Sequence, residues 1–452
     1  MTQTSSISII GAGLVGSLLA LGLAKKGYRV HVFESRPDLR KNDISAGKSI
    51  NLALANRGIR ALEQQGIFDQ VKPLLIEMKG RMVHLTDQQA QFQTYGINEH
   101  EVIYSISRGG LNALLLDEAE KLPNVTLNFN HRVTGVDLDN KQLSFKDEQQ
   151  QNHLFDRVIG TDGANSVLRE AIAEHSQTPT QVTIDTLSHG YKELAILPDS
   201  NGKHQIEVNA LHIWPRQDFM LIALPNLDGS FTLTLFLAKT GETSFEQLTS
   251  NEQIMTFFKQ QFPDVYPLID SLARDFNENP TGNLATVRCQ QWHYQDIALL
   301  LGDAAHAIVP FHGQGMNCGF EDCYDLLNQI PPAGAESNWL EIFSNTQTLR
   351  KPNANAIADM ALENYIEMRA SVAEPTFLRQ KEIARQLQSW FPEHFTPRYA
   401  MVMFGELPYA QAQRIGETHK ALLRKIDDWQ QQGNTLTQAD GQRFLREFGL
   451  MS

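Results

Sequence analysis

GDAAHAIVPFHGQGMNCGFED, residues 302 to 322, follows directly after the apolar run IALLL at residues 297 to 301. The run predicts a buried strand, and the Gly302-Asp303 pair predicts a turn that carries one acidic side chain into a helix. Glycines recur at positions 313, 315 and 319, near the expected start of that helix. Such glycines let the backbone approach a flat or anionic ligand, toward which the free N–H groups of the first helical turn point. The stretch therefore predicts a ligand-binding turn, although an ordinary glycine-rich connection would share its local features.

The N-terminal segment has the pattern of a dinucleotide-binding unit. An apolar strand is expected at residues 7 to 10, a helix at residues 14 to 26 and a second strand at residues 29 to 35. The turn between the first strand and the helix contains Gly11, Gly13 and Gly16. In this order, such glycines permit a tight turn, the close approach of a pyrophosphate and the close packing of helix on strand. The segment therefore predicts nucleotide binding.

Charged side chains follow several of the expected strands. Glu34 ends the second strand about twenty residues after the glycines, where a carboxylate can accept hydrogen bonds from ribose hydroxyls. Ser35 and Arg36 come next in the chain. The segment RVIGTDGANSVLRE runs from a strand into Asp162-Gly163, which repeats the acidic turn of the opening stretch. In YSISRGGLNALLLDEAEKL, Arg108 stands between a strand and a helix, near the helix N-terminus.

An alternating pattern between residues 80 and 96 predicts a hairpin with its turn near Gln88. This pairing brings Arg81 and Tyr95 nearly opposite one another, although a slip of one residue would move one of them to the other face. Arginine offers a bidentate fork to a carboxylate, and a tyrosine hydroxyl supplies a further donor. The alternative is a solvated surface arginine.

Further apolar patterns extend to the C-terminus. Alternating segments between residues 186 and 285 predict an antiparallel sheet inserted into the nucleotide-binding body, with a helix near 252 to 261. After residue 322 the pattern is helical. In the helix expected at 353 to 370, Asn364 falls on the apolar face, where it either satisfies a backbone group or lines a pocket. Tyr399 lies in a later apolar stretch, PRYAMVMFGELPY.

Composition excludes several classes of protein. The net charge of −13 is spread along the chain without a basic block, which argues against nucleic acid as a partner. The three cysteines, Cys289, Cys318 and Cys323, argue against a disulfide framework. No His or carboxylate group has metal-ligand spacing in the sequence. The glycine-interrupted N-terminal segment does not fit a signal or membrane anchor, so we expect a soluble, cytoplasmic protein.

Three separated motifs together resemble those of a known family. GAGLVG with Glu34, DRVIGTDGANSVLR and LLLGDAAHAIVPFHGQGMNCGFED match, in order and spacing, the single-component aromatic hydroxylases that bind FAD. Within that group, SINLALANRG, GRMVH, YSISRGGLN and ENYIEMR are similar to the kynurenine 3-monooxygenase family. The likeness runs from residue 7 to about residue 405.

The resemblance implies an α/β fold with a Rossmann-like FAD-binding domain, an inserted antiparallel β-sheet domain for the substrate and C-terminal helices. The implied FAD-binding domain covers residues 1–75, 100–185 and 286–370, the substrate domain 76–99 and 186–285, and the helical region 371–452.

The resemblance also implies roles for individual residues. The positions that match cofactor contacts are Gly11, Gly13, Gly16, Glu34, Ser35, Arg36, Ala53, Arg108, Val133, Asp162, Asp303, Gly315, Met316 and Asn317. By itself, Ala53 would be read as a packed alanine. The positions that match substrate contacts are Arg81, Tyr95, Asn364 and Tyr399, with the first two at the amino-acid end of L-kynurenine. No role carries over to His312.

The implied reaction is the conversion of L-kynurenine and O₂ to 3-hydroxy-L-kynurenine through a flavin C4a-hydroperoxide, with NADPH as reductant, in tryptophan degradation by the kynurenine pathway. The amino group of the substrate activates the ring, so no general base is expected, and His84, His306 and His312 are expected to be structural. Two alternatives stay open: an FAD hydroxylase of another aromatic acid such as a salicylate-like phenol, and a flavin-binding protein without turnover. A monomer and a homodimer are both compatible with the sequence.

Overall fold

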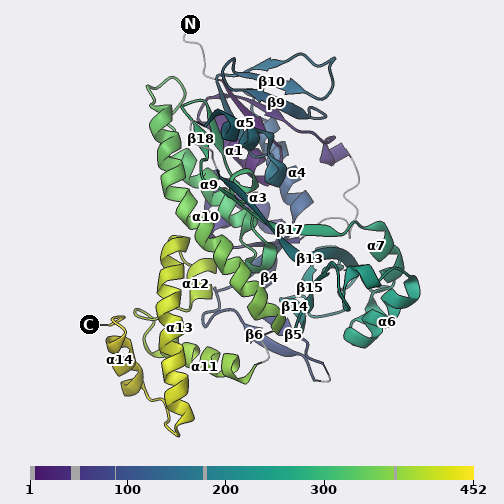
Figure 1. The fold of residues 1–452 in the computed structure, drawn as a ribbon, viewed down its shortest axis with the longest axis vertical. Coiled ribbons are helices and arrows are strands. Elements are labelled where there is room, and N and C mark those ends of the chain that lie inside the picture. Colours follow the sequence, from purple (N-terminus) through teal and green to yellow (C-terminus); the bar gives the residue numbers. More distant parts are fainter. Residues whose placement is uncertain (1–5, 42–50, 87, 177–180, 371–373, 452) are drawn as a thin grey trace.

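A six-stranded sheet forms the centre of the nucleotide-binding body in the computed structural model, which describes residues 6–41, 51–86, 88–176, 181–370 and 374–451 (Figure 1). Its strand order is β18-β19-β12-β1-β2-β8. The bounds are β1 Ser6–Ile10, β2 Arg29–Phe33, β8 Val125–Asn128, β12 Arg157–Gly160, β18 His293–Tyr294 and β19 Ala298–Leu300. Only β18 is antiparallel to its neighbour in this sheet. The apolar runs of the inner strands are fully buried, as parallel strands covered on both faces require.

Helices cover this sheet. They are α1 Leu14–Lys25, α4 Arg108–Glu120, α5 Val167–His175, α8 Asp303–His306 and α9 Gly315–Gln329. Together β1, α1 and β2 confirm the strand, helix and strand expected at the N-terminus, with ends that differ from the expected ones by one or two residues.

Three turns meet at the carboxyl edge of the sheet. The Thr161 N–H donates to the Ile10 carbonyl oxygen at 2.9 Å, and the Leu301 N–H donates to the Gly160 carbonyl oxygen at 2.9 Å. The glycine turn after β1 and the two acidic turns after β12 and β19 therefore lie side by side. Ligands of open α/β sheets bind outside this edge.

A seven-stranded sheet lies beside the body, with the order β17-β13-β16-β15-β14-β5-β6. The bounds are β5 Gly80–Val83, β6 Gln91–Thr94, β13 Val182–Ile196, β14 Ala210–Arg216, β15 Phe219–Pro225, β16 Phe231–Ala238 and β17 Gly282–Cys289. One face packs on α6 Asn251–Gln261 and α7 Leu272–Glu278 around a separate apolar core. The expectation of a wholly antiparallel sheet is wrong at one pair: β5 and β14 are parallel, because the hairpin comes from an earlier part of the chain and joins the sheet at its edge.

The remaining elements are short. Two three-stranded sheets contain β3 Asn51–Leu54, β4 Ile76–Met78 and β7 Ile103–Ser107, and β9 Val133–Asp137, β10 Gln142–Phe145 and β11 His153–Leu154. The short helices are α2 Asn56–Gln64, α3 Phe68–Val71, η1 Leu39–Lys41, η2 Lys72–Leu74, η3 Gly163–Asn165, η4 Phe245–Gln247, η5 Tyr266–Leu268 and η6 Pro310–His312.

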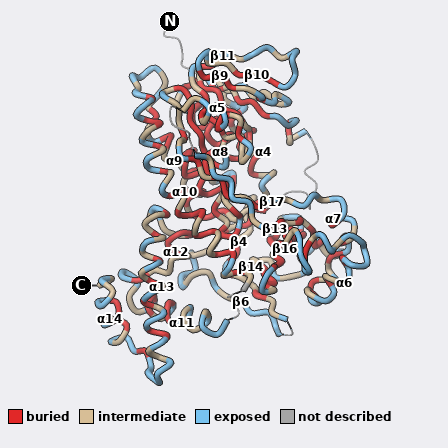
Figure 2. The backbone as a smooth tube through the Cα atoms, viewed as in Figure 1, coloured by how far each residue is buried: buried red, intermediate tan, exposed pale blue. Residues whose placement is uncertain are grey.

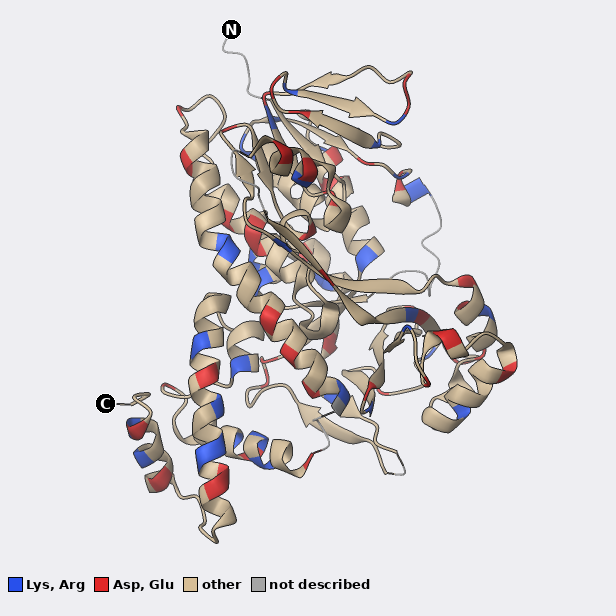
Figure 3. Cartoon of the chain, viewed as in Figure 1, with Lys and Arg blue, Asp and Glu red and all other residues tan. Residues whose placement is uncertain are grey.

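The C-terminal part is helical, as expected. It comprises α10 Trp339–Ala370, α11 Pro375–Trp390, α12 Arg398–Met403, α13 Tyr409–Gln431 and α14 Gln438–Glu447. Figure 1 shows α10 running along the body toward the second sheet, with α13 beside its lower half. Buried residues concentrate in the body, whereas the outer faces of α11, α13 and α14 are exposed (Figure 2) and carry both signs of charge (Figure 3). Within the described residues, no helix is long and apolar enough to cross a membrane.

His419 on α13 allows a test of acid sensitivity in this helical part. Its ring is 4% exposed and stacks on Phe395 at a centroid distance of 4.3 Å. Both ring nitrogens lack a hydrogen-bond partner among the described residues, and burial lowers the pKa of His419 to about 4. Between about pH 6.5, the ordinary histidine pKa, and pH 4, the unfolded chain therefore binds a proton that the folded chain does not, so stability falls as the pH falls.

We expect His419→Leu to remove this penalty. The free energy of unfolding should rise by about 2 kcal/mol more at pH 5 than at pH 8, since one pH unit corresponds to about 1.4 kcal/mol. Urea denaturation of both proteins at the two pH values measures the difference. His394→Leu, which changes an exposed histidine, is the control. Equal gains for His419→Leu at both pH values would show that the buried ring does not titrate in this way.

Candidate functional site

The three glycines after β1 have different surroundings. Gly11 has φ +98°, and a Cβ added there would lie 2.6 Å from the Thr161 carbonyl oxygen. A Cβ at Gly16 would lie 2.0 Å from the Gly11 carbonyl oxygen. In contrast, no atom of the described residues lies within 4 Å of a Cβ built on Gly13. Gly11 and Gly16 are therefore required by the chain itself, whereas the open space at Gly13 fits the close approach of a phosphate group.

Glu34 lies over the same turn. Its carboxylate accepts a hydrogen bond from the Ala12 N–H at 3.0 Å and forms a salt bridge with Arg36 at 2.9 Å. Burial alone would raise the pKa of Glu34. The Arg36 guanidinium and two backbone N–H groups lower it by more than burial raises it, so the pKa lies below its ordinary value and the carboxylate is ionised. The Ser35 hydroxyl also donates to it at 3.2 Å. Glu34 is thus an anionic hydrogen-bond acceptor directly after β2, which suits a residue that accepts hydrogen bonds from ribose hydroxyls.

The chain that leads to Val133 passes beside Glu34. The His131 N–H donates to the Glu34 carbonyl oxygen at 2.8 Å, and the Asn130 N–H donates to the Arg36 carbonyl oxygen at 3.1 Å. Val133 itself begins β9 and is buried. This places three of the proposed cofactor positions, Glu34, Arg36 and Val133, along one end of the site.

The two acidic turns occupy the middle of the edge. One carboxylate oxygen of Asp162 accepts from the Val167 N–H at 2.8 Å, and its Oδ1 is buried without a hydrogen-bond partner among the described residues. Asp303 and Arg108 are the first residues of α8 and α4, their side chains are exposed, and the charge of Arg108 acts on the Asp303 carboxyl. These side chains therefore share one polar region.

The turn before α9 packs on β3. The Asn317 amide donates to the Ala53 carbonyl oxygen at 2.8 Å and accepts from the Ala55 N–H at 2.9 Å. Its side chain is wholly buried, so a ligand contact by Asn317 would come from its backbone. A Cβ at Gly313 would lie 3.1 Å from the Ala53 Cβ, so Ala53 leaves little room for a side chain at position 313. Gly315 and Met316 begin α9 directly after this turn.

Arg81, Tyr95 and Tyr399 come together from β5, the end of the hairpin and α12. The Arg81 guanidinium carbon lies 5.6 Å from the Tyr95 ring centroid and 5.0 Å from that of Tyr399. The two rings stack at 5.5 Å. Arg81 pairs with Gln93 rather than standing opposite Tyr95, so the expected register is wrong by two residues. A shift of two keeps both side chains on the same face, which is why the contact survives.

The electrostatics of this aromatic cluster favour a carboxylate. Arg81 forms no salt bridge with any described carboxylate, although its side chain is only partly exposed. Burial raises the pKa of Tyr95 and of Tyr399, so both hydroxyls stay protonated, and the Tyr95 hydroxyl has no hydrogen-bond partner of normal geometry among the described residues. His312 stacks on Tyr399 at 5.6 Å, and burial lowers its pKa to about 4, so its ring is neutral. The cluster therefore offers one cation and two neutral donors.

Asn364 lies near this cluster but is bonded within the protein. Its amide donates to the Phe311 carbonyl oxygen at 2.5 Å and approaches the Met368 sulfur at 3.4 Å. Of the two roles left open by the sequence, satisfying a backbone group is therefore the one observed. Phe311 in turn stacks on Tyr365 with a centroid distance of 3.9 Å. Asn364 thus positions the backbone next to His312.

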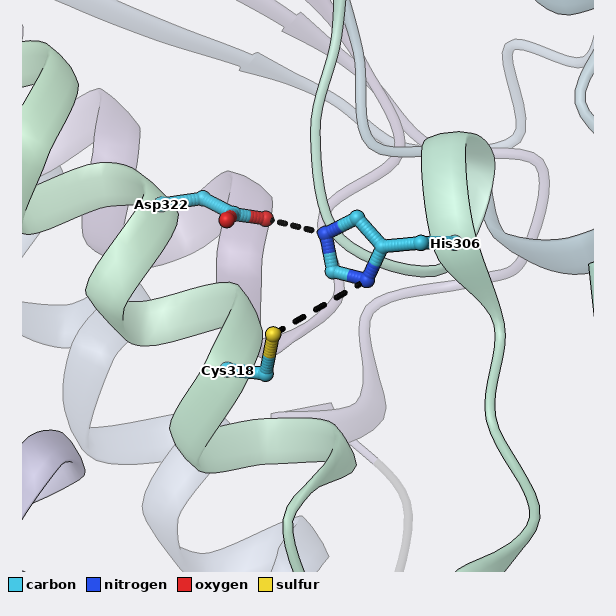
Figure 4. A group of neighbouring side chains, drawn as sticks. All are labelled: His306, Cys318 and Asp322. Carbon is cyan, nitrogen blue, oxygen red and sulfur yellow. Dashed lines mark hydrogen bonds and ion pairs between the residues drawn. The ribbon is translucent and has the colours of Figure 1, made fainter. Parts of the chain in front are cut away.

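Ligand spacing along the chain does not predict the buried group made of His306, Cys318 and Asp322 (Figure 4). These three could offer ligand atoms within 4.8 Å of one another. However, the Asp322 carboxylate already accepts hydrogen bonds from His306 Nε2 at 2.6 Å and from Arg350 Nε at 2.8 Å. The Arg350 guanidinium also lies 3.6 Å from the Cys318 sulfur. A guanidinium so close disfavours a metal cation, so the group is better described as a buried ion-pair network. His84 is likewise paired, with Asp264 at 2.9 Å.

Comparisons with known proteins identify a family and chains of similar fold. The family model described as FAD binding domain matches residues 3–360. A kynurenine 3-monooxygenase of Stenotrophomonas maltophilia is 47% identical over 92% of this chain and 91% of its own. One from Myxococcus xanthus is 43% identical over 94% of this chain and 91% of its own. Among solved structures, 2-methyl-3-hydroxypyridine-5-carboxylic acid oxygenase in its tetrameric form has a TM-score of 0.67 at 18% identity, covering 83% of this chain and 96% of that one. PqsL of Pseudomonas aeruginosa with 2-aminobenzoylacetate has a TM-score of 0.65 at 18% identity, covering 81% and 97%.

Proposed function

The chain belongs to the FAD-binding monooxygenase family of the kynurenine 3-monooxygenases, and from this membership we propose that it hydroxylates L-kynurenine to 3-hydroxy-L-kynurenine with NADPH and O₂. As a flavin-dependent monooxygenase it uses FAD and NADPH. The proposal adds the substrate, the product and the residues that hold them. In this reading the protein takes part in tryptophan degradation by the kynurenine pathway.

One observation carries the choice of substrate. Arg81 is enclosed by two tyrosine rings and lacks a carboxylate partner among the described residues. The Glu367 carboxylate acts on this guanidinium without forming a salt bridge with it, so the hydrogen-bonding fork of Arg81 has no carboxylate partner and favours the binding of an anion. The α-carboxylate of an amino acid can receive the guanidinium fork together with the Tyr95 hydroxyl. Tyr399 then packs beside the aliphatic part of the same ligand.

The cofactor positions form the second part of the proposal. FAD bound along the carboxyl edge supplies electron transfer from NADPH and the activation of O₂. We assign the phosphates to the space at Gly13, the ribose hydroxyls to Glu34, and the ribityl side to Asp303 and Arg108. The N–H groups at Gly315, Met316 and Asn317 are assigned to the flavin ring, in keeping with the positive end of a helix.

The residues around the substrate bind, orient and exclude water, and none is needed as a base. The aniline nitrogen of kynurenine activates its own ring. Phe311, Phe236, Met220 and Met368 belong to one apolar group between the second sheet and α10. Such a lining keeps water from the reacting atoms and holds the ring in place. His312 stays neutral at physiological pH, because burial lowers its pKa to about 4.

Oxygen consumption by the purified holoenzyme tests the proposal. With NADPH, addition of L-kynurenine should accelerate oxygen uptake, and chromatography should show 3-hydroxy-L-kynurenine in proportion to NADPH oxidised. Salicylate and p-hydroxybenzoate serve as alternative substrates. Product formation from a phenolic acid but not from L-kynurenine would favour the other hydroxylase class. A yellow protein that oxidises no NADPH with any of these acids would favour a flavin-binding protein without turnover.

A further inference from the structure

The connection between α12 and α13 is anchored to the turn before α9. We call residues 403 to 409 the α12–α13 joint. The wholly buried Gln314 donates from its amide to the Met403 sulfur at 3.0 Å and accepts from the Tyr409 hydroxyl at 2.5 Å. Both bonded atoms of the Gln314 side chain are thus engaged by the C-terminal helices rather than by the body from which Gln314 comes.

Arg57 on α2 holds the same joint from a second side. Its guanidinium carbon lies 3.9 Å from the Tyr409 ring centroid, and one of its nitrogens donates to the Leu407 carbonyl oxygen. The neighbouring Asn56 amide donates to the Phe404 carbonyl oxygen at 3.2 Å. Arg57 is 1% exposed and also forms a salt bridge with Glu321 on α9. Tyr409 is therefore fixed at both its ring and its hydroxyl.

The salt bridge between Arg57 and Glu321 continues into further buried polar contacts that reach Gly302. Glu321 is shared between Arg57 and Arg350, and Arg350 also pairs with Asp322 at 2.8 Å. Asp322 in turn accepts from the Gly302 N–H at 3.0 Å. The segment from Gly302 to Gly315 is consequently held from behind at both ends by one connected set of buried polar side chains.

The backbone of this turn has little rigidity of its own. Gly313 has φ +65°, and Gly315 follows Gln314 directly. Two glycines give the unbound chain many conformations, so the turn depends on hydrogen bonds to keep one geometry. The Gly313 N–H donates to the Pro310 carbonyl oxygen at 2.8 Å, and the Asn317 amide donates to the Gly313 carbonyl oxygen at 2.9 Å. The Gln314 side chain, between the two glycines, adds a further constraint, because the Tyr409 hydroxyl on α13 donates to it.

We propose that Tyr409 is a positioning residue for the flavin: its hydroxyl fixes Gln314 and thereby the Gly313–Gly315 turn, which leads into the N–H groups at Gly315, Met316 and Asn317 that are assigned to the flavin ring. The C-terminal helices are then part of the cofactor site, although no residue of α13 needs to touch FAD. The inference rests on the flavin position of the proposed function, but not on the identity of the aromatic substrate.

Tyr409→Phe tests this, because it keeps the ring under Arg57 and removes only the hydroxyl. The variant should bind FAD about three- to tenfold more weakly, since one buried hydrogen bond to the turn is lost. It should also shift the absorbance spectrum of bound flavin. The matched control is Tyr28→Phe, which removes a hydroxyl that donates to the Pro331 carbonyl oxygen at 3.1 Å. That variant should lose a similar amount of thermal stability and leave FAD affinity and spectrum unchanged.

A double variant tests whether Tyr409 acts on FAD binding through Gln314. In a Gln314→Met background, Tyr409→Phe should have no further effect on FAD affinity, because the group that it orients is gone. Full wild-type affinity and spectrum in Tyr409→Phe would overturn the inference, as would an undiminished effect of Tyr409→Phe in the Gln314→Met background. FAD affinity is measured without substrate, so a wild-type protein that binds FAD but ignores L-kynurenine contradicts the proposed function alone.

Discussion

Arg81→Ala is expected to raise the KM for L-kynurenine by about 10- to 150-fold, while FAD content and the thermal midpoint stay close to the wild type. The range corresponds to about 1.5 to 3 kcal/mol, the usual value of a hydrogen bond to a charged group. The loss should be large because the guanidinium is enclosed by Tyr95 and Tyr399 and forms no salt bridge with a described carboxylate, Glu367 acting on it only from a longer distance. Steady-state kinetics with varied kynurenine measure it.

Two further variants sharpen this test. Lys79→Ala removes an exposed cation just before the same strand and should leave the KM unchanged, which separates a specific contact from a general loss of positive charge. Arg81→Lys keeps the charge but not the bidentate fork, so most of the defect should remain. If Arg81→Ala binds kynurenine normally, the carboxylate of the substrate lies elsewhere.

Gly13→Val is expected to give a protein that folds but is isolated almost free of FAD, with affinity reduced by about 100-fold or more. Gly13 has φ −73° and ψ −175°, which a valine adopts readily, and its side chain would enter space that holds no described atom. The apoprotein should therefore keep its circular dichroism spectrum. The ligand, in contrast, would lose the close backbone approach on which phosphate binding depends. Flavin fluorescence on titration with FAD measures the affinity.

Gly16→Ala is the informative contrast to this variant. Its Cβ would lie 2.0 Å from the Gly11 carbonyl oxygen and 2.5 Å from the Thr161 hydroxyl, so the fold itself should be destabilised. We expect low soluble yield and a lowered thermal midpoint. Normal FAD affinity in Gly13→Val would place the pyrophosphate away from this turn.

Turns and strands that depend on neighbouring residues were the features best predicted from the sequence. Gly11, Gly13 and Gly16, the apolar run at 297 to 301 and the alternation on either side of Gln88 each fix a turn or a strand through neighbouring residues. The corresponding elements all appear, with small differences at their ends. Spacing indicated Gly11, Gly13, Gly16, Glu34 and the Arg81–Tyr95 pair, and the family resemblance supplied further site residues and the role of each.

What the sequence did not predict depends on contacts between distant segments. Nothing local shows that Asp322 pairs with Arg350, or that Tyr409 reaches Gln314 across 95 positions. Nor does any local pattern show that the Asn317 side chain bonds to the backbone of β3 and of the residue before α2. The adjacent acids Glu321 and Asp322 on a helix that is otherwise apolar on its inner face were the one available signal, since buried acids require partners.

The strand order of the central sheet has a consequence for biosynthesis. β1 lies between β2, which follows within some twenty residues, and β12, whose pairing with β1 joins residues 150 positions apart. β19 adds to β12 only after residue 298 has been made. During translation, the chain must therefore leave β12 with an unpaired edge until nearly two thirds of the protein has emerged, a period in which such edges invite aggregation. Because Gly302 and Asp303 come last to this edge, FAD cannot stabilise the nascent chain before this segment has emerged, and cofactor supply should influence the yield of holoenzyme only late in translation or after release from the ribosome.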